Sequence, residues 1–337
     1  MTDDQRMPAA TTSHHRAGGG FCNPWANAEL HGLMDFLRWR FGSGHDRVRA
    51  PSPPFGSLPT RAPAILAPRA AHGHRSATWI GHSTVLLQLG ALNVLTDPVW
   101  SDRASPLQWI GPRRLMPPGV EFNALPEIDL VLLSHNHYDH LDKSTVKRLA
   151  KRFPNAQWLC PLGLARLLQS WGVKRITEHD WWQRVDAPSF RATCTPAQHF
   201  SSRGLSDRND TLWCGWTIET DEARVFFAGD TALHPEFGVI GERLGPFDLV
   251  MLPIGAYDPR WFMRAVHMDP DDALAAYRAI TNSRGDTPPC LALHWGTFRL
   301  TDEPVDEPPA LFARAWRDAA LPESARWIFA HGETRRL

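Results

Sequence analysis

Short apolar runs, each closed by a polar or turn residue, dominate the chain from residue 76 onward. They read ATWIGH, TVLLQL, NVLTDP, DLVLLSH, RVFFAGD, DLVMLPI, CLALHW and RWIFAH. Runs of this length that are rich in Val, Leu and Ile are typical of buried strands. Between them, residues 142–153 and 269–280 carry apolar side chains at helical spacing, and Asp269 and Pro270 form a helix-start signal. The alternation predicts one layered α/β domain over residues 76–337.

The first 75 residues have a different pattern. Residues 1–20 are small and polar and end in three glycines, so we expect them to be disordered. Residues 21–75 are expected to form an N-terminal helix and an arm that pack on the domain or link to it. The helix is predicted near residues 28–41 from apolar side chains at helical spacing, which are Leu30, Leu33, Met34, Leu37 and Phe41. Six prolines between residues 51 and 68 predict an extended arm.

The predicted helix has two interpretations. It packs against the domain core, as most amphipathic helices do, or it lies at a membrane surface with its apolar face in lipid. Arg38 and Arg40 supply positive charge beside the apolar stripe. We therefore keep peripheral membrane contact through residues 28–41 as a hypothesis, on the inner membrane face of a cytoplasmic protein.

Composition narrows the function class. The chain has 337 residues with 36 Lys+Arg and 36 Asp+Glu, and its formal net charge of zero argues against a nucleic-acid surface. No apolar run approaches the roughly 20 residues that span a bilayer, and the N-terminus does not resemble a secretory signal. The five cysteines are scattered without a CxxC spacing, which suits a reducing compartment. We expect a cytoplasmic globular protein.

Four of the apolar runs end near side chains that bind metals. The run DLVLLSH leads into the cluster HNHYDH, and three further runs lead to His199, Asp230 and His294. Imidazole and carboxylate are ligands of Zn²⁺, and α/β folds place their chemistry at strand ends. Accidental clustering of histidines is the alternative, and the convergence of four runs disfavours it. The candidate ligands are His135, His137, Asp139, His140, His199, Asp230 and His294. Seven ligands suffice for two ions that share one carboxylate.

These residues resemble the metallo-β-lactamase superfamily of hydrolases. The wider chain is similar to one branch of it, the N-acylphosphatidylethanolamine-hydrolysing phospholipase D family and its bacterial relatives. The similar stretches run from residue 21 almost to the C-terminus and include FCNPW (21–25), WIGHSTV (79–85), LTDPVWSDRASPLQWIGPRR (95–114), IGAYDPRWFM (254–263) and HWGTF (294–298). The HxHxDH motif identifies only the superfamily, whereas the last two stretches are more specific to the branch.

The resemblance implies a fold and a mechanism. The fold is an αββα sandwich of two mixed β-sheets flanked by helices, with two zinc ions at one edge. His135, His137 and His199 would hold the first ion, Asp139, His140 and His294 the second, and Asp230 would bridge them. A hydroxide held between the ions would attack a phosphodiester, with Asp139 orienting it. The implied reaction converts N-acylphosphatidylethanolamine to phosphatidic acid and an N-acylethanolamine.

Three further residues each have a functional and a structural interpretation. Asp97 and His82 could orient ligand imidazoles, or they could be an Asp-Pro turn residue and a capped strand end. His267 could contact a phosphate oxygen or protonate the leaving group, or it could be a solvated loop residue. We take Asp139 and His267 as the catalytic candidates.

Other functions share the same cage of ligands. A dizinc hydrolase of a small soluble ester or sugar-phosphate lactone is the principal alternative. A nuclease is disfavoured by the zero net charge, and a closed structural zinc site would need only four protein ligands. The expected partners are a phospholipid or other phosphodiester substrate and a second copy of this chain in a homodimer, with no nucleic acid.

Overall fold

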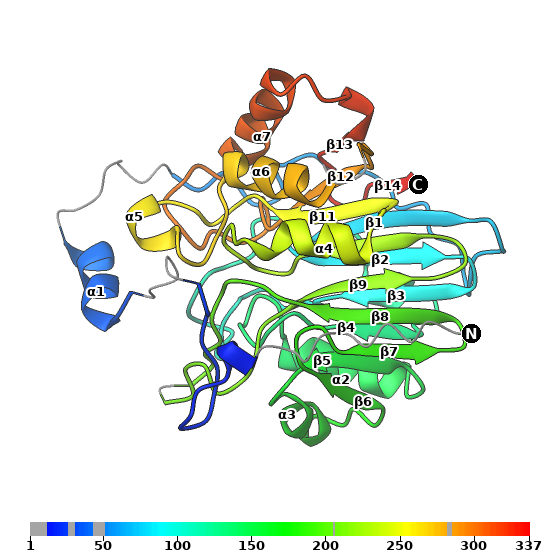
Figure 1. Ribbon diagram of the computed structural model, residues 1–337, viewed down its shortest axis with the longest axis horizontal. Helices are drawn as coiled ribbons and strands as arrows, with labels where there is room; N and C mark the ends of the chain where they lie inside the picture. Colours follow the sequence, from blue (N-terminus) through cyan, green and yellow to red (C-terminus); the bar gives the residue numbers. More distant parts are fainter. Residues whose placement is uncertain (1–11, 26–30, 43–50, 205, 282–284) are drawn as a thin grey trace.

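The computed structural model describes residues 12–25, 31–42, 51–204, 206–281 and 285–337. Within this part of the chain two seven-stranded sheets face each other (Figure 1). The first sheet has the order β14 (Thr334–Arg336), β1 (Arg75–Gly81), β2 (Thr84–Leu89), β3 (Leu92–Thr96), β4 (Leu130–Leu132), β5 (Gln157–Pro161) and β6 (Ile176–His179). The second has the order β13 (Arg326–Trp327), β12 (Cys290–Leu293), β11 (Leu249–Pro253), β10 (Arg224–Phe227), β9 (Gly215–Glu219), β8 (Phe190–Thr195) and β7 (Arg184–Ala187).

Both sheets are mixed, and they are built in the same way. Antiparallel pairing joins the first strands of each half, from β1 to β3 and from β7 to β10. Parallel pairing then continues from β3 to β6 and from β10 to β13. The carboxyl ends of the parallel strands therefore lie along one edge of the sandwich, where the loops after them can meet.

The described helices are α1 (Leu33–Phe41), α2 (Lys143–Arg152), α3 (Ala165–Ser170), α4 (Glu236–Leu244), α5 (Arg260–Met263), α6 (Pro270–Thr281) and α7 (Glu307–Asp318). All but α1 and α5 cover the outer faces of the two sheets, whereas α1 and α5 lie at one end of the molecule (Figure 1). Side chains of α2 and α3 share a buried cluster with β2, β3 and β4 of the first sheet. Helices α4, α6 and α7 pack in series against the second sheet. The arrangement is the αββα sandwich predicted from the sequence.

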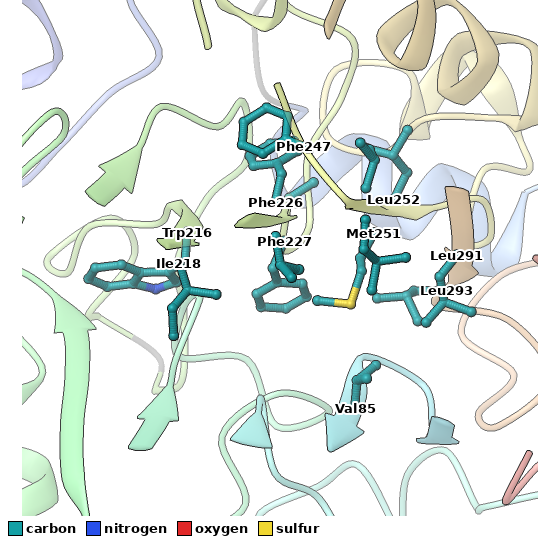
Figure 2. Packing of buried hydrophobic residues seen from close by; sticks show 14 of the residues in the cluster. Val85, Trp216, Ile218, Phe226, Phe227, Phe247, Met251, Leu252, Leu291 and Leu293 are labelled. Carbon is teal, nitrogen blue, oxygen red and sulfur yellow. The ribbon is translucent and has the colours of Figure 1, made fainter. Parts of the chain in front are cut away.

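The core lies between the sheets and continues under the helices of the second one. Figure 2 shows Phe227 and Met251 pointing toward Val85 of the opposite sheet, whereas Phe226 and Leu252 point the other way. All five side chains are almost fully buried. Alternate residues of β10 and β11 thus face opposite layers, so these strands are apolar on both faces, which explains their continuous hydrophobic runs.

The predicted helices are present with small shifts at their ends. Helix α2 covers most of residues 142–153, and Asp142 accepts a hydrogen bond from the Ser144 amide as its N-cap. Helix α6 begins at Pro270, and Asp269 caps it by accepting from the Asp272 amide at 2.8 Å. Residues 51–68 contain no helix, in agreement with their prolines. No described helix is both long and apolar enough to cross a membrane.

The N-terminal segment differs from the expectation of disorder over residues 1–20. Residues 1–11 lie outside the described part of the chain. From Thr12 onward the segment packs on the body: His14 is only 1% exposed, and its Nε2 lies 2.6 Å from Asp180 Oδ1. The His14 ring stacks on Trp181 with a centroid separation of 4.1 Å. These two buried contacts hold His14 in place, although the composition of the surrounding segment does not predict an ordered structure.

Helix α1 begins later than predicted and contacts the body through one side. Of the predicted range 28–41, residues 28–30 lie outside the described residues, and the helix spans Leu33–Phe41. Trp39 is buried, and its Nε1 donates to Asp302 Oδ2 at 2.6 Å. Met34 and Phe41 are 77% and 82% exposed. The helix lies at one end of the molecule, beside α5 (Figure 1).

Candidate metal centre

Four loops deliver the predicted ligands to one edge of the sandwich. The loop after β4 carries His135 to His140, and the segments after β8, β10 and β12 carry His199, Asp230 and His294. These strands belong to both sheets, so neither sheet alone forms the cluster. The structure brings all seven predicted ligand residues together, although only β12 leads directly into its ligand.

Three imidazoles form the first half of the cluster. His135 Nε2 lies 2.8 Å from His137 Nδ1, and His199 Nε2 lies 3.2 Å from the same atom. His135 and His199 are fully buried, and His137 is half-buried. Three ring nitrogens that face a common point form a suitable donor set for a metal ion.

Asp139, His140 and His294 form the second half of the cluster, with His82 beside them. Asp139 Oδ2 lies 3.3 Å from His140 Nε2, 3.4 Å from His294 Nε2 and 2.8 Å from His82 Nε2. The same four residues can place one ligand atom each around a single ion. The HxHxDH spacing therefore divides between two groups, as the resemblance implies.

Asp230 lies between the two halves. Its Oδ2 is 3.0 Å from His140 Nε2 and 3.1 Å from His294 Nε2, and it is 3.9 Å from the Nε2 atoms of His135 and His199. The carboxylate is 2% exposed. A buried carboxylate at this position can bind ions in both groups.

Several buried polar atoms of the cluster lack a hydrogen-bond partner in the described structure. They include His140 Nε2, His294 Nε2 and Asp230 Oδ1. His140 Nε2 and His294 Nε2 approach Asp230 Oδ2 at ion-pair distance, 3.0 and 3.1 Å, but without the geometry of a good hydrogen bond. Leaving such groups unsatisfied is costly in a buried site, and a bound cation would satisfy them. The residues present therefore fit metal ions.

In His135, His140 and His199, the ring nitrogen that faces away from the cluster has a partner that fixes the orientation of the ring. His140 Nδ1 lies 2.7 Å from Asp97 Oδ2, and His199 Nδ1 lies 2.9 Å from the Val266 carbonyl. His135 Nδ1 lies 2.8 Å from Ser134 Oγ, which donates to Asp97 Oδ2 at 2.5 Å. Donation from Nδ1 leaves the Nε2 lone pair available to a metal.

The structure places both of the proposed orienting residues beside the cluster. Asp97 contacts His140 and Ser134, and His82 Nε2 contacts Asp139. His82, Asp97 and His294 have φ values of 56°, 31° and 63°. This left-handed backbone region is strained for residues other than glycine, and such strain is concentrated at functional sites.

Burial and charge set the protonation of the first three imidazoles and the two carboxylates. Burial lowers the pKa of His137 to about 3 and that of His199 to about 4, and it lowers the pKa of His135 well below its ordinary value. Burial opposes charge on Asp230, but His140 and His294 hold its pKa well below the ordinary range. These are the neutral imidazoles and ionised carboxylates that metal binding requires.

The pKa values of His140 and His294 are shifted in the opposite direction. Burial opposes their charge, yet Asp230 and Asp139 outweigh it, raising the pKa of His140 well above its ordinary value and that of His294 to about 9. The two carboxylates therefore attract positive charge to this half of the cluster, either as protons or as a metal ion.

His267 lies at the border of the cluster. Its ring centroid is 5.0 Å from that of His199 and 5.2 Å from that of His294, and its Nδ1 has no partner among the described residues. The solvated-loop interpretation does not fit, because the residue is only 8% exposed. The ring is placed to contact a molecule bound at the metal centre.

Asn23 contacts the backbone of a ligand residue, and sequence reasoning assigned it no role. Its Nδ2 donates to the His199 carbonyl at 2.8 Å, and its Oδ1 accepts from the His199 amide at 3.2 Å. The same Oδ1 accepts from Trp213 Nε1 at 3.2 Å. The only signal in the sequence was the FCNPW stretch, which carried the resemblance without indicating a role for the asparagine.

Comparison with known proteins places the chain in a family. A family model described as a beta-lactamase superfamily domain matches residues 92–295. The chain belongs to the beta-lactamase superfamily. The Mycobacterium tuberculosis protein Rv0906 is a relative in this superfamily, 43% identical over 277 residues, which cover 82% of this chain and 71% of the relative.

Two further comparisons relate to activity and fold. N-acyl-phosphatidylethanolamine-hydrolyzing phospholipase D 1 of Caenorhabditis elegans is 41% identical over 234 residues, which cover 66% of this chain and 64% of that enzyme. The structure of Igni18, a metallo hydrolase from the archaeon Ignicoccus hospitalis, matches with a TM-score of 0.59 at 23% identity, over 78% of this chain and 98% of that one. This structural match shows the metallo-β-lactamase fold.

Proposed function

We propose that this chain is a dizinc phosphodiesterase that converts N-acylphosphatidylethanolamine to phosphatidic acid and an N-acylethanolamine. The supporting observation is the position of Asp230 Oδ2, which lies within 3.9 Å of ligand nitrogens from both halves of the cluster. The 41% identity to an enzyme named for this reaction supports the choice of substrate.

Zinc ions in the two groups would lower the pKa of bound water to near 7 and neutralise charge on phosphoryl oxygens. His135, His137 and His199 would hold one ion, and Asp139, His140 and His294 the other. Asp139 also contacts His82 at 2.8 Å, which fixes the orientation of its carboxylate. Water supplies the oxygen that joins phosphorus, the bond between phosphorus and the alcohol oxygen of the N-acylethanolamine breaks, and a proton of the water passes to that alcohol oxygen.

His267 is the proposed contact for the substrate. Because its Nδ1 has no partner among the described residues, this nitrogen is available to a phosphoryl oxygen or to the leaving oxygen. The Arg260 guanidinium donates to the His267 carbonyl at 2.9 Å, which holds the backbone in place. The ring can therefore be positioned before substrate binds.

A lipid substrate requires contact with a membrane surface, and helix α1 has exposed apolar side chains suited to such contact. Met34 and Phe41 are almost fully exposed, and Phe36 and Leu37 are 41% and 38% exposed. We propose that α1 makes peripheral contact with the inner face of the membrane in the cytoplasm. A homodimer is also proposed, as expected from the sequence.

The decisive experiment mixes zinc-loaded protein with an N-acylphosphatidylethanolamine dispersion and identifies the products by mass spectrometry. Asp139→Asn removes a metal-binding oxygen and should lower turnover by at least about 100-fold. Asp271→Asn changes an exposed carboxylate on α6 and should leave turnover unchanged. Phosphatidic acid and N-acylethanolamine should therefore appear with the wild type and with Asp271→Asn.

Two other outcomes would redirect the assignment. Survival of the lipid together with hydrolysis of a soluble activated phosphodiester or lactone would support the small-ester alternative. Full activity of Asp139→Asn would contradict the mechanism for either substrate.

A further inference from the structure

A cavity lies beside the loop that carries His135 to His140. Its volume is about 550 Å³, and Tyr138 of the HNHYDH loop forms part of its wall. Four cationic side chains from three segments also line it, namely Arg103, Lys143 and Lys147 of α2, and Arg203. None of the seven predicted metal ligands is among its described lining residues. The cavity is therefore distinct from the metal centre.

The carboxylate in this cavity does not neutralise the four cations. Asp142 is 7% exposed and caps helix α2 through Oδ1. Its Oδ2 accepts from Thr145 Oγ1 at 2.5 Å and from the Ser101 amide at 3.0 Å. Within the described residues no ion pair is formed by Arg103, Lys143, Lys147 or Arg203. The cavity consequently keeps an excess of positive charge.

Arg203 is held in place without a carboxylate partner. One of its guanidinium nitrogens donates to the carbonyls of Asn136 and Leu141, both at 2.7 Å, and the guanidinium lies 4.0 Å from the Tyr138 ring centroid. Burial lowers the pKa of Arg203, although Tyr138 and the carboxylates of Asp142, Asp207 and Asp139 act in the opposite direction. A fixed, planar cation of this kind suits recognition of a phosphate group.

One side of the cavity is bordered by a loop with an apolar tip, which we call the tongue. Residues 103–113 form a loop that is closed at its base by an antiparallel bridge between Arg103 and Arg113. The guanidinium of Arg103 donates to the Gly111 carbonyl at 2.6 Å, which stiffens the loop. Ser105, Pro106 and Gln108 of the tongue line the cavity. Its tip exposes Leu107, Trp109 and Ile110, which are 46%, 73% and 53% accessible.

Cationic and apolar features at this tongue favour one kind of ligand. A free phosphate would use the cations but leave the apolar tip in water. A phospholipid would use both, because Trp and Leu side chains enter the interface of a bilayer while basic groups meet the headgroup phosphate. We propose that the cavity binds the phosphate group of an anionic phospholipid while the tongue tip inserts into the bilayer surface. This second lipid contact does not depend on which ester the metal centre hydrolyses.

The test measures sedimentation of the full-length protein with vesicles. Binding should be strong for phosphatidylcholine vesicles containing phosphatidic acid and weak for phosphatidylcholine alone, and it should decrease with added salt. Lys143→Glu/Lys147→Glu should weaken binding at least about tenfold, because each basic residue near an anionic surface contributes a several-fold factor. Leu107→Ser/Trp109→Ser should weaken it without changing the cationic charge.

A matched pair of variants controls for total charge. Lys151→Glu/Lys174→Glu makes the same change in charge at exposed positions that do not line the cavity. An equal loss of binding in this pair would overturn the proposal. Thermal unfolding midpoints verify that both double variants fold. Asp139→Asn should keep its vesicle binding, so a failure of the proposed activity is distinguishable from a failure of this site.

A second arm distinguishes the lipid from a free phosphate. Glycerol 3-phosphate is titrated into the wild type and into Lys143→Glu/Lys147→Glu by calorimetry. If the soluble phosphate bound through these lysines while vesicles did not bind, the lipid assignment would be overturned. Vesicle binding that depends on both the lysines and the tongue tip supports it.

Discussion

Residues 12–25 and helix α1, which both precede the sandwich in the chain, differ in how they contact it. Residues 12–25 contain only a three-residue 3₁₀ helix, Thr12–His14, yet they place His14 and Asn23 in polar contacts with Asp180 and with the His199 backbone. Helix α1 is regular, yet it contacts the body mainly through Trp39 and leaves Met34 exposed. Regular secondary structure is therefore a poor guide to which part supports the metal centre. The positions of a few polar side chains matter more.

Among changes in the N-terminal extension, the largest expected effect comes from removing the asparagine contact. Asn23→Ala deletes both hydrogen bonds to the His199 backbone and should reduce zinc affinity or turnover about 10- to 100-fold, as for other residues that orient ligands. Metal content and the kinetics of a soluble phosphodiester measure this. Asn155→Ala, at an exposed position, is the control. Unchanged zinc affinity and turnover in Asn23→Ala would show that residues 12–25 do not support the site.

An intermediate effect is expected at the other anchor of the same segment. Asp180→Asn weakens the contacts of both Asp180 oxygens with His14 and His15 and should lower the free energy of unfolding by about 1.5–3 kcal/mol. Chemical denaturation at neutral pH measures the loss, and Asp271→Asn, which removes one charge from the first turn of α6, should lose less than about 1 kcal/mol.

The same carboxylate predicts a pH dependence. Burial opposes its charge, but His14 and His15 outweigh this and lower the pKa of Asp180. A lowered pKa means that the unfolded chain takes up the proton first. The stabilisation is therefore complete above the ordinary value of about 3.9 and is lost as pH falls through the folded value. The acid-side loss of stability should be smaller in Asp180→Asn. An identical acid profile in the variant would contradict the role of this contact.

The smallest effect on stability is expected in helix α1. Phe36→Ser/Leu37→Ser changes exposed side chains and should alter the free energy of unfolding by less than about 0.5 kcal/mol, while lowering vesicle binding. Leu66→Ser removes a comparably exposed apolar group elsewhere and should keep vesicle binding. Equal binding by both variants and the wild type would leave α1 without a membrane role.

Much of the fold could be predicted because its central strands are buried on both faces. The runs that became β10, β11 and β12 are apolar apart from Arg224, so their pattern needed no tertiary information. Strands β5, β6, β7, β9 and β14 were not identified. Strands β6, β7 and β14 lie at the edges of their sheets with half-exposed or exposed residues, and β14 pairs with β1 from the far end of the chain. Strands β5 and β9 are interior and largely buried, but polar residues interrupt their apolar pattern.

The candidate ligands could be predicted for a similar reason. Four of them lie within six residues, and the other three follow apolar runs, so local sequence was informative. The contacts that orient them are different. Asn23 is separated from His199 by 176 positions, and the His14 contact with Asp180 spans 166 positions. No local pattern encodes such a pairing, and His14 and His15 appeared to belong to a segment without order.

The left-handed backbone at His82, Asp97 and His294 has a consequence for how such a chain can change over time. Glycine would relieve about 1–3 kcal/mol of strain at each position, but it would remove the side chain that contacts the cluster. At Asp97 the loss of a buried carboxylate that accepts from Ser134 and His140 would offset this relief. At His82 and His294 the strain is balanced only by the contacts of the imidazole with the cluster. Retention of His at these two positions in homologous chains would therefore indicate that the cluster is under selection.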